Sequence, residues 1–468
     1  MYQETTLPMI EKVPAKKFMQ VAAVTSVSLG TFCAGTVLCW TSPALTHIEI
    51  PSNLTANTSP GFSVTASQAA LIGSTLTIGA LVAAIPTGYL ADKFGRKPTI
   101  IGLAVMFLIN WVLISFARNY VLVIVARLFA GIGLGGICVV APMYIGEISE
   151  ASSRGFFGSF LQLFLAGGVF FTCLVGSLTN WVGLGLILAL IPILLGVSFS
   201  FMPESPIYLI SKDKRKQAEK NLKILRGSFY DISEEISNME QNLAQAKKSN
   251  VILRELLTNK STRRALLAGI GALVFQQFSG INAIIFYTVT IFKEAGTDIS
   301  PFLAAVIVNS VQWTASIIPM LVIERANRKM FLIMSSLGMM ICLVGLGMFF
   351  HLKTILINNS YLSFIPLSST ILYMIFFCIG FGPIPWMLLG ELFSPEIKGF
   401  ATGVSILVNW SSAFIVTFSF PLLNAAYGSH IAFYILGGIM GVATLFVYFA
   451  IPETRGKTLN EIQEELNR

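Results

Sequence analysis

Long apolar segments separated by short polar ones fill almost the whole chain. Each is about 20 residues or longer, enough for a helix that rises 1.5 Å per residue to cross a hydrocarbon layer of roughly 30 Å. Backbone that faces lipid must satisfy its hydrogen bonds internally, so the segments should be helices; they lack the alternation of a membrane barrel. The pattern predicts an all-α membrane protein of twelve transmembrane helices, near residues 18–41, 65–91, 98–117, 121–145, 156–179, 182–202, 265–290, 301–323, 330–351, 364–392, 400–425 and 429–450.

The composition agrees with a lipid bilayer as the surroundings of these segments. Of the 468 residues, 54% are hydrophobic and only 12% are charged, and the mean hydropathy is +0.75. A soluble protein needs a charged surface, whereas a membrane protein shows apolar side chains to lipid. The formal net charge is +8, but the basic residues lie in the short loops, which argues against nucleic acid as a partner.

Basic residues gather in alternate loops between the apolar segments. Cytoplasmic loops of membrane proteins carry an excess of lysine and arginine, so the alternation predicts the orientation. We expect a multi-pass protein of the plasma membrane with both termini cytoplasmic. The basic loops contain Lys93, Arg96 and Lys97, then Arg154, the stretch 212–226, Arg263 and Arg264, then Arg325, Arg328 and Lys329, then Lys398, and finally Arg455 and Lys457.

The polar segments divide the chain into five parts. The apolar runs fall into two sets of six, and the polar insert between them shows apolar residues at helical spacing, which predicts short amphipathic helices on the cytoplasmic face. The expected parts are a cytoplasmic tail at 1–17, a six-helix bundle at 18–202, a helical linker at 203–263, a second six-helix bundle at 264–451 and a cytoplasmic helix at 452–468.

The predicted outer loop, residues 42–64, carries two glycan acceptor patterns, at Asn53 and Asn57. Such triplets mark glycosylation only where they face the outside, so we expect glycans at these two asparagines if the loop is external as predicted. All six cysteines fall within apolar runs, so we expect no disulfide framework, and the three histidines are scattered, so we expect no metal site and no cofactor.

Charged landmarks of the first half return in the second half at similar offsets. A duplicated six-helix unit, with both copies in the same orientation, is typical of secondary transporters with a substrate path between the copies. Asp92 returns as Glu324 (324 − 92 = 232), Glu147 and Arg154 return as Glu391 and Lys398 (391 − 147 = 244), and Pro203-Glu204-Ser205 returns as Pro452-Glu453-Thr454 (452 − 203 = 249).

These acidic and basic residues lie at predicted cytoplasmic helix ends, which favours a role in gating. They can pair across the two halves when the inner side is shut and separate when it opens. The alternative is that they are solvated loop charges that only fix the topology. The predicted inner gate consists of Asp92, Arg96, Glu147, Arg154, Glu324, Arg328, Glu391 and Lys398.

Further motifs extend the pattern to nearly the whole chain. They are Gly88-x-x-x-Asp92-Lys93-x-Gly95-Arg96-Lys97, Arg127 at the start of the fourth run, Glu147 to Arg154, Pro203-Glu204-Ser205-Pro206, Gln276-Gln277-Phe278-Ser279-Gly280-Ile281-Asn282, Gly382-Pro383-Ile384-Pro385-Trp386, Glu391, and Pro452-Glu453-Thr454-Arg455-Gly456.

With these motifs the chain resembles the sugar porters of the major facilitator superfamily, including the insect facilitated trehalose transporters and the animal facilitative glucose transporters. The resemblance implies a central sugar site. Amides both donate and accept hydrogen bonds, which suits vicinal hydroxyls, and an indole face suits the C–H surface of a sugar. The alternative is that the amides bond helices together. The implied site residues are Gln162, Gln276, Gln277, Asn282, Asn309, Trp386 and Asn409.

Two of these segments need irregular backbone for the site to form. On a regular helix Gln276 and Asn282 would lie about 240° apart, so we expect Gly280 to interrupt the helix, as in the discontinuous helices of transporters. Pro383 and Pro385 should likewise kink the tenth segment. Cys378 stands where the glucose transporters carry a glutamate, which leaves the favoured sugar open.

The sequence favours a uniporter that moves a hexose or trehalose down its gradient and works as a monomer. The alternative is a proton-coupled symporter, but the first segment, 18–41, has no Asp, Glu or His that could carry the proton. A further alternative is a sugar sensor, although the chain ends soon after Lys457, which leaves little room for a signalling domain. The sequence shows no nucleophile paired with a general base, so we do not expect an enzyme.

Overall fold

The described part of the computed structural model is helical, with no strand among its residues. Within it, 12 helices or helix pairs are long and apolar enough to cross a membrane, which confirms the predicted fold class. The structure describes residues 17–48, 62, 64–150, 153–248, 259–322, 327–355, 363–393, 395–457 and 459–467.

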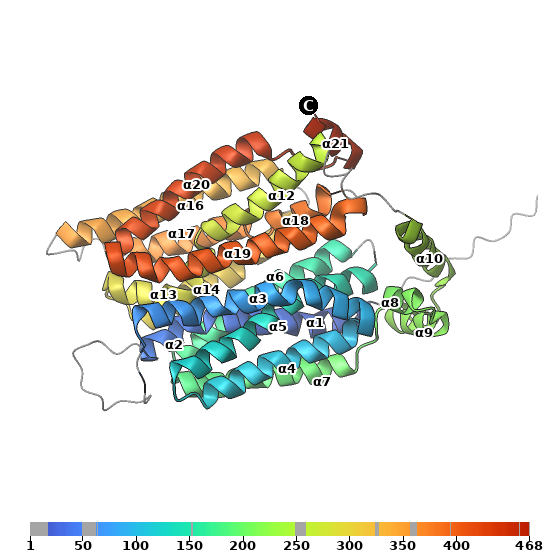
Figure 1. The fold of residues 1–468 in the computed structure, drawn as a ribbon, viewed down its shortest axis with the longest axis horizontal. Helices are drawn as coiled ribbons and strands as arrows, with labels where there is room; N and C mark the ends of the chain where they lie inside the picture. The colour runs from blue at the N-terminus through green and yellow to red at the C-terminus, as the bar shows by residue number, and fades with distance from the viewer. Residues whose placement is uncertain are drawn as a thin grey trace, which may run out of the picture.

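The first six spanning segments lie side by side along one half of the molecule (Figure 1). The first is formed by two helices, since α1 continues into α2 through Trp40, whose dihedrals stay helical (φ −51°, ψ −37°). The helices of this half are α1 (Phe18–Cys39), α2 (Thr41–Ile48), α3 (Ala66–Phe94), α4 (Arg96–Ser115), α5 (Tyr120–Ile148), α6 (Arg154–Gly176) and α7 (Trp181–Ser200).

The last six spanning segments form the other half, which is more interrupted. Three of them consist of two helices each. The helices are α12 (Lys260–Phe278), α13 (Ile281–Ala295), α14 (Pro301–Ala315), α15 (Ile317–Val322), α16 (Arg328–Ile355), α17 (Ile365–Ile379), α18 (Ile384–Glu391), α19 (Pro395–Tyr427) and α20 (Ser429–Ala450).

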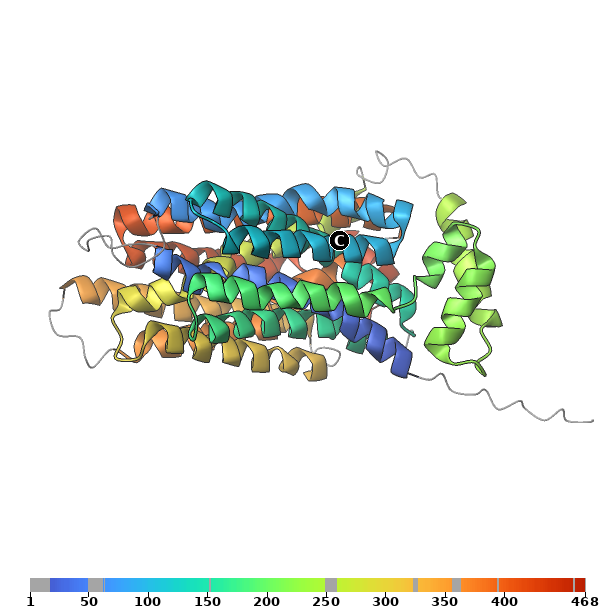
Figure 2. The same ribbon diagram turned by 90° about the horizontal axis from the view of Figure 1, so that it is seen from below.

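Short helices cover one end of the bundle, which we call the inner end (Figures 1 and 2). They include α9, whose apolar face buries Ala218, Leu222 and Leu225, as the amphipathic pattern of the linker predicts. Figure 2 shows that the dark blue start of α1 lies at this end too. The helices are α8 (Pro206–Ser211), α9 (Arg215–Arg226), α10 (Ser233–Lys248) and α21 (Leu459–Asn467).

The start of the predicted outer loop is a helix instead. Residues 41–48 form α2, because Pro43 suits the first turn of a helix and Ala44, Leu45 and Ile48 are buried. The helix packs against α13 of the other half, and Ser42 Oγ accepts a hydrogen bond from the backbone N–H of Val289 at 3.1 Å. The predicted glycan sites Asn53 and Asn57 lie outside the described residues.

Glycines let α3 and α5 approach each other within the first half. A Cβ placed on Gly131 would lie 2.1 Å from the carbonyl oxygen of Leu76, and one on Gly79 would lie 2.4 Å from that of Leu128. Real Cβ atoms do not come so close to backbone, so only glycine fits. Small residues at helix contacts are the usual way in which membrane helices pack closely, and here they hold α3 directly against α5.

Candidate substrate path and inner charge clusters

The seventh spanning segment breaks where the sequence predicts it. Helix α12 ends at Phe278, and Gly280 adopts the left-handed conformation (φ +86°, ψ +11°) before α13 begins. Glycine takes this conformation at little cost. The break brings two predicted site residues together, because Asn282 Nδ2 donates to Gln277 Oε1 at 2.6 Å.

Gln277 joins a second helix to this contact. Its Nε2 donates to Asn409 Oδ1 on α19 at 2.8 Å, so three amides form a chain from α13 through α12 to α19. All three side chains are buried. Asn409 Nδ2 is left without a hydrogen-bond partner, and it is therefore available as a donor to a ligand.

Gln276 reaches the break in the tenth spanning segment. Helix α17 ends at Ile379 and α18 begins at Ile384, with non-helical backbone at Gly380 (φ −128°, ψ −79°). Gln276 Nε2 donates to the freed carbonyl oxygens of Phe381 at 2.5 Å and Gly382 at 2.9 Å. Its own Oε1 is buried without a partner.

Asn309 connects the two halves near the middle of α14. Its Nδ2 donates to the carbonyl oxygen of Ala305 at 2.8 Å and to Cys173 Sγ, on α6 of the first half, at 3.2 Å. Cys173 Sγ also lies 2.9 Å from Cys39 Sγ. Asn309 Oδ1 has no hydrogen-bond partner.

Two predicted site residues are not joined to these amides. Trp386 on α18 is 37% exposed, Gln162 on α6 is partly exposed, and the structure gives neither side chain a hydrogen bond to a described residue. Sequence reasoning also missed Gln312, a buried amide of α14 that is 1% exposed and has an unpartnered Oε1. Its signal was an amide three residues after Asn309 in an apolar run.

The unpartnered atoms indicate what the amides can bind. Gln276 Oε1, Asn309 Oδ1 and Gln312 Oε1 are acceptors, and Asn409 Nδ2 is a donor. A buried polar group without a partner costs about 1–3 kcal/mol. A ligand with several hydroxyl groups can both donate and accept, so it can bond acceptors and donors of these kinds.

Arg127 is a buried charge within the first half. It lies in the second turn of α5 and is fully buried. Its guanidinium donates to the carbonyl oxygens of Val37 at 2.6 Å and Ile72 at 3.3 Å and lies over the Trp40 ring, 5.5 Å from the centroid. Nη2 has no hydrogen-bond partner. The hydrogen bonds of this arginine thus go to backbone carbonyls and not to a carboxylate.

Two hollows of the molecule lie away from the amides. One, of about 440 Å³, is lined by His47 of α2, Trp181 of α7 and Arg118 in the turn after α4, among others. The other, of about 490 Å³, lies between α3 and α4 and is almost entirely apolar. Neither hollow is lined by a predicted site residue, so the candidate path is defined by the chemistry of the amides and by the hydrogen bonds that join Gln277, Asn282 and Asn409.

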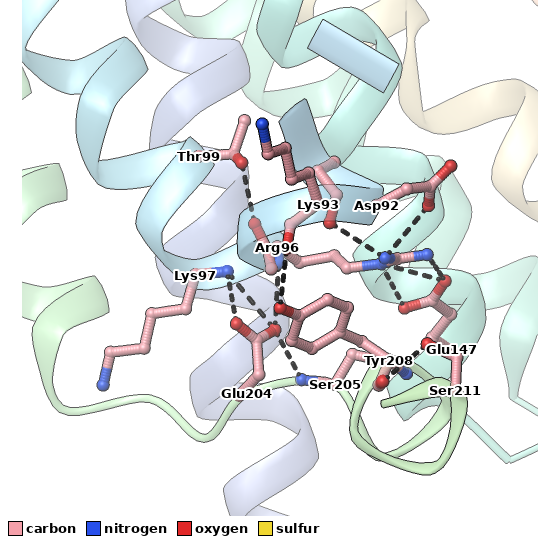
Figure 3. Close-up of polar contacts among 12 residues, drawn as sticks. Asp92, Lys93, Arg96, Lys97, Thr99, Glu147, Glu204, Ser205, Tyr208 and Ser211 are labelled. Atoms are coloured by element: carbon pink, nitrogen blue, oxygen red, sulfur yellow. Dashed lines mark hydrogen bonds and ion pairs between the residues drawn. The ribbon is translucent and has the colours of Figure 1, made fainter. Parts of the chain in front are cut away.

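A charge cluster closes the inner end of the first half (Figure 3). Arg96 pairs with Glu147 at 2.7 Å and with Asp92 at 3.1 Å. Glu204 Oε1 accepts from the backbone N–H of Arg96 at 3.1 Å, and its Oε2 accepts from that of Lys97 at 3.1 Å. The cluster therefore ties the ends of α3, α4 and α5 to the segment before α8.

The second half repeats this construction. Glu453 accepts from the backbone N–H groups of Arg328 and Lys329, at 3.0 and 3.1 Å, and Arg328 lies 3.4 Å from Glu391. Thr454 Oγ1 donates to Glu391 at 2.5 Å. Arg328 follows Arg96 by 232 residues, and Glu453 follows Glu204 by 249, so the sequence repeat is also a structural one.

The predicted pairing across the two halves differs from these contacts. In both clusters the partners that the structure gives belong to the same half, because each carboxylate sits beside the helix ends of its own bundle. Glu324 lies outside the described residues, as do the side chains of Arg154 and Lys398. The described polar contacts between halves lie farther from the inner end, at Ser42 and at Asn309.

Glu204 and Glu453 were not among the predicted gate residues, although the repeat contained them. Burial raises the pKa of the Glu204 carboxyl above its usual value, and the opposing effect of the N–H groups of Ser205, Lys97 and Arg96 is smaller. These N–H groups belong largely to the start of α4, where a negative charge is favourable. Glu204 thus serves as an anchor for that helix start.

Replacing Glu391 with alanine should change the balance between the two orientations of the carrier. The substitution removes an acceptor that Arg328 and Thr454 share. This loss should change the free-energy difference between the two orientations by roughly 1 kcal/mol. The half-saturation concentrations for influx and efflux should then differ about fivefold. Tracer flux in both directions measures this. Glu465→Ala, which removes an exposed pair with Lys457, is the control; an equal loss in both directions with poor expression would indicate a purely structural role.

The arrangement of the spanning segments and of their breaks is that of a membrane carrier. The described residues form twelve segments long and apolar enough to span a membrane, in two halves, and two of these segments are broken beside buried amides, as in a multi-pass membrane carrier. The family model described as "Sugar (and other) transporter" matches residues 22–466. The chain therefore belongs to this sugar transporter family.

Curated relatives and solved structures agree with that family. The facilitated trehalose transporter of Culex quinquefasciatus is 35% identical over 463 residues, covering 98% of this chain and 88% of that one. The one of Apis mellifera ligustica is also 35% identical, over 97% and 89% of the two chains. The partially occluded, inward-open xylose transporter XylE from E. coli has a TM-score of 0.78 at 23% identity, covering 94% and 99%, and shows the same fold.

Proposed function

We propose that this chain is a facilitative sugar carrier that moves trehalose or a hexose down its gradient. Two bundles, residues 18–202 and 264–451, would rock about a site between them, so that the site faces one side of the membrane at a time. The curated relatives named above as facilitated trehalose transporters support trehalose as a substrate.

The observation that carries the proposal is the set of unpartnered amide atoms. Gln276, Asn309 and Asn409 each keep one buried polar atom free of hydrogen bonds, although their other atoms are bonded. Polar residues within a membrane are costly and usually face a substrate path. Sugar hydroxyls would satisfy these atoms, and Trp386, at 37% exposure, offers a ring face.

The surroundings of Arg127 favour uniport over proton coupling. A coupled proton needs a titratable group in the path. Helix α1, which contributes the carbonyl oxygen of Val37 to Arg127, contains no Asp, Glu or His. The partners of Arg127 are backbone oxygens, which bind no proton in the physiological pH range. None of these partners is a carboxylate that could carry a coupled proton.

We also propose the setting in which the carrier works. The basic residues of the inner end, in the linker helices and the two charge clusters, support a cytoplasmic inner end. The location would then be the plasma membrane with both termini cytoplasmic. The substrate path lies within one chain, which supports a functional monomer.

Transport by the purified protein in liposomes tests the proposed function. We expect uptake of radiolabelled trehalose, glucose or fructose that saturates, stops when the sugar gradient is gone and is unchanged by an imposed pH gradient or a protonophore. Empty liposomes are the control. Uptake that a protonophore abolishes while the sugar gradient persists would favour the symporter, and no uptake or binding of any of the sugars would reject the proposal.

A further inference from the structure

We propose that Cys39 and Cys173 form an oxidation site, at which a peroxide joins the two thiols in a disulfide and weakens a contact between the two halves. Formation of the disulfide does not depend on the proposed function, whereas its effect on transport rests on it. Three observations carry the proposal: the distance between the sulfur atoms, the close approach of their helices, and a hydrogen bond from Asn309 of the other half.

The two thiols are already in contact. Cys39 Sγ, at the end of α1, lies 2.9 Å from Cys173 Sγ, near the end of α6. Both cysteines are free and buried, at 0% and 2% exposure. A disulfide requires the sulfur atoms to approach from this distance to about 2.0 Å. The structure gives no second contact between two cysteine sulfurs among the described residues.

A glycine holds the two helices at backbone contact one turn before the cysteines. A Cβ placed on Gly35 of α1 would lie 2.0 Å from the carbonyl oxygen of Leu165 and 2.9 Å from the backbone nitrogen of Val169, both on α6. Cys39 follows Gly35 by four residues, and Cys173 follows Val169 by four. The helices therefore run parallel, and their close contact continues to the cysteines.

Cys173 also faces the second half of the molecule. Its Sγ accepts a hydrogen bond from Asn309 Nδ2 on α14 at 3.2 Å. A rocking motion that parts the halves at this point exposes Cys173 to the path. A buried thiol is inert until it is exposed, so this motion gives a small oxidant access to a sulfur that is enclosed here.

Oxidation of the pair by hydrogen peroxide is balanced. Cys173, as a thiolate, attacks one peroxide oxygen; the O–O bond breaks, and the second oxygen leaves as hydroxide and takes up the thiol proton as water. Cys39 Sγ then attacks the sulfur of the resulting sulfenic acid. The S–S bond forms, the S–O bond breaks, and a second water leaves with the proton of Cys39. The pair loses two electrons, and the peroxide gains them.

The disulfide changes the contact that Asn309 makes. Helices α1 and α14 both pack on α6, α1 from the first half and α14 from the second. Drawing Cys173 Sγ toward Cys39 moves it toward its own half and away from Asn309. The contact lies toward the end of the bundle opposite the inner end, so its loss favours the orientation in which that end is open.

The alternative is that the two cysteines only fill space between α1 and α6. A free buried cysteine often behaves as a small apolar residue, and such a pair would stay reduced. In the proposed orientation, however, this end of the path opens to the cell exterior, where disulfides form and persist.

Peptide mapping of the oxidised protein tests the oxidation site. The full-length protein in liposomes is treated with hydrogen peroxide, the remaining thiols are capped with a maleimide, and the digest is examined by mass spectrometry. We expect a peptide pair linked through Cys39 and Cys173 that a thiol reductant separates, and no such pair in Cys39→Ser. Two thiols that stay free, or that oxidise separately to sulfinic acids, would overturn the proposal.

Tracer flux in both directions, in liposomes with the protein in one known orientation, tests the effect on transport. After peroxide the half-saturation concentration for influx should fall about threefold relative to that for efflux. A reductant should restore it, and Cys39→Ser should not respond. Cys39→Ala serves the same purpose if the serine variant folds poorly.

Cys33→Ser is the matched control. Cys33 is also a buried cysteine of α1, and its replacement should leave the response to peroxide intact. A disulfide that forms without changing the ratio of the two half-saturation concentrations would refute the link to Asn309, while sugar transport itself would uphold the proposed function. A disulfide in a protein that transports none of the sugars would uphold the oxidation site and reject the proposed function.

Discussion

Gln277→Ala is expected to reduce sugar flux about 100-fold while the amount of protein in the membrane stays the same. Gln277 accepts from Asn282 and donates to Asn409, so its loss removes two internal hydrogen bonds as well as an amide at the proposed site. Two hydrogen bonds of about 1–1.5 kcal/mol each correspond to roughly 100-fold. Initial rates of tracer uptake, divided by surface protein, measure the effect.

Gln217→Ala is the matched control for this substitution. Gln217 lies on α9 of the linker and is exposed, so the same change of side chain should leave flux within experimental error. Flux by Gln277→Ala that equals the wild type would remove Gln277 from the substrate site. Loss of the protein from the membrane would instead assign the amide chain to folding.

Gly131→Leu is expected to prevent the first half from folding. A Cβ at this position would lie 2.1 Å from the carbonyl oxygen of Leu76 and 2.7 Å from the Cα of Gly79. Backbone atoms cannot move aside as a flexible side chain can, so α3 and α5 would have to separate. Such overpacking costs about 3 kcal/mol or more. The readout is the amount of monodisperse protein after detergent extraction, which should fall about tenfold or more.

The same helix provides the control. A Cβ added to Gly146 on α5 would meet no atom of a neighbouring residue within 4 Å, so Gly146→Leu should extract like the wild type. Normal extraction of Gly131→Leu would mean that the close contact between α3 and α5 is not required. Poor extraction of both variants would mean that leucine anywhere along this helix is harmful.

The sequence determined the spanning segments because length and hydropathy are local properties. It also located the break at Gly280, since two amides that should meet lay on opposite faces of a regular helix. Helix α2 was missed because its apolar residues are few and follow a polar turn, and their burial depends on α13 of the other half. Contacts between distant segments are not encoded in a local pattern.

The candidate site was only partly predictable for the same reason. The amides at 276, 277, 282, 309 and 409 were named from the sequence, but their partners were not. That Gln277 joins Asn282 to Asn409 depends on how α12, α13 and α19 pack. Which residues pair in the inner clusters also depends on packing, because the sequence does not say whether Glu147 pairs within its own half or with the other half. Gln312 gave a signal, an amide in an apolar run, but its burial without a partner for Oε1 depends on how α14 packs.

The two halves differ in where their spanning segments are broken, and from this difference we expect unequal stiffness. In the first half α1 passes into α2 with helical dihedrals, and glycine contacts fix α3 against α5. In the second half the backbone departs from the helix at Gly280 and Gly380. A rocking motion concentrates strain where bending is easiest. The first half would therefore move as a rigid bundle, and the second would bend at its two helix breaks to close around the sugar.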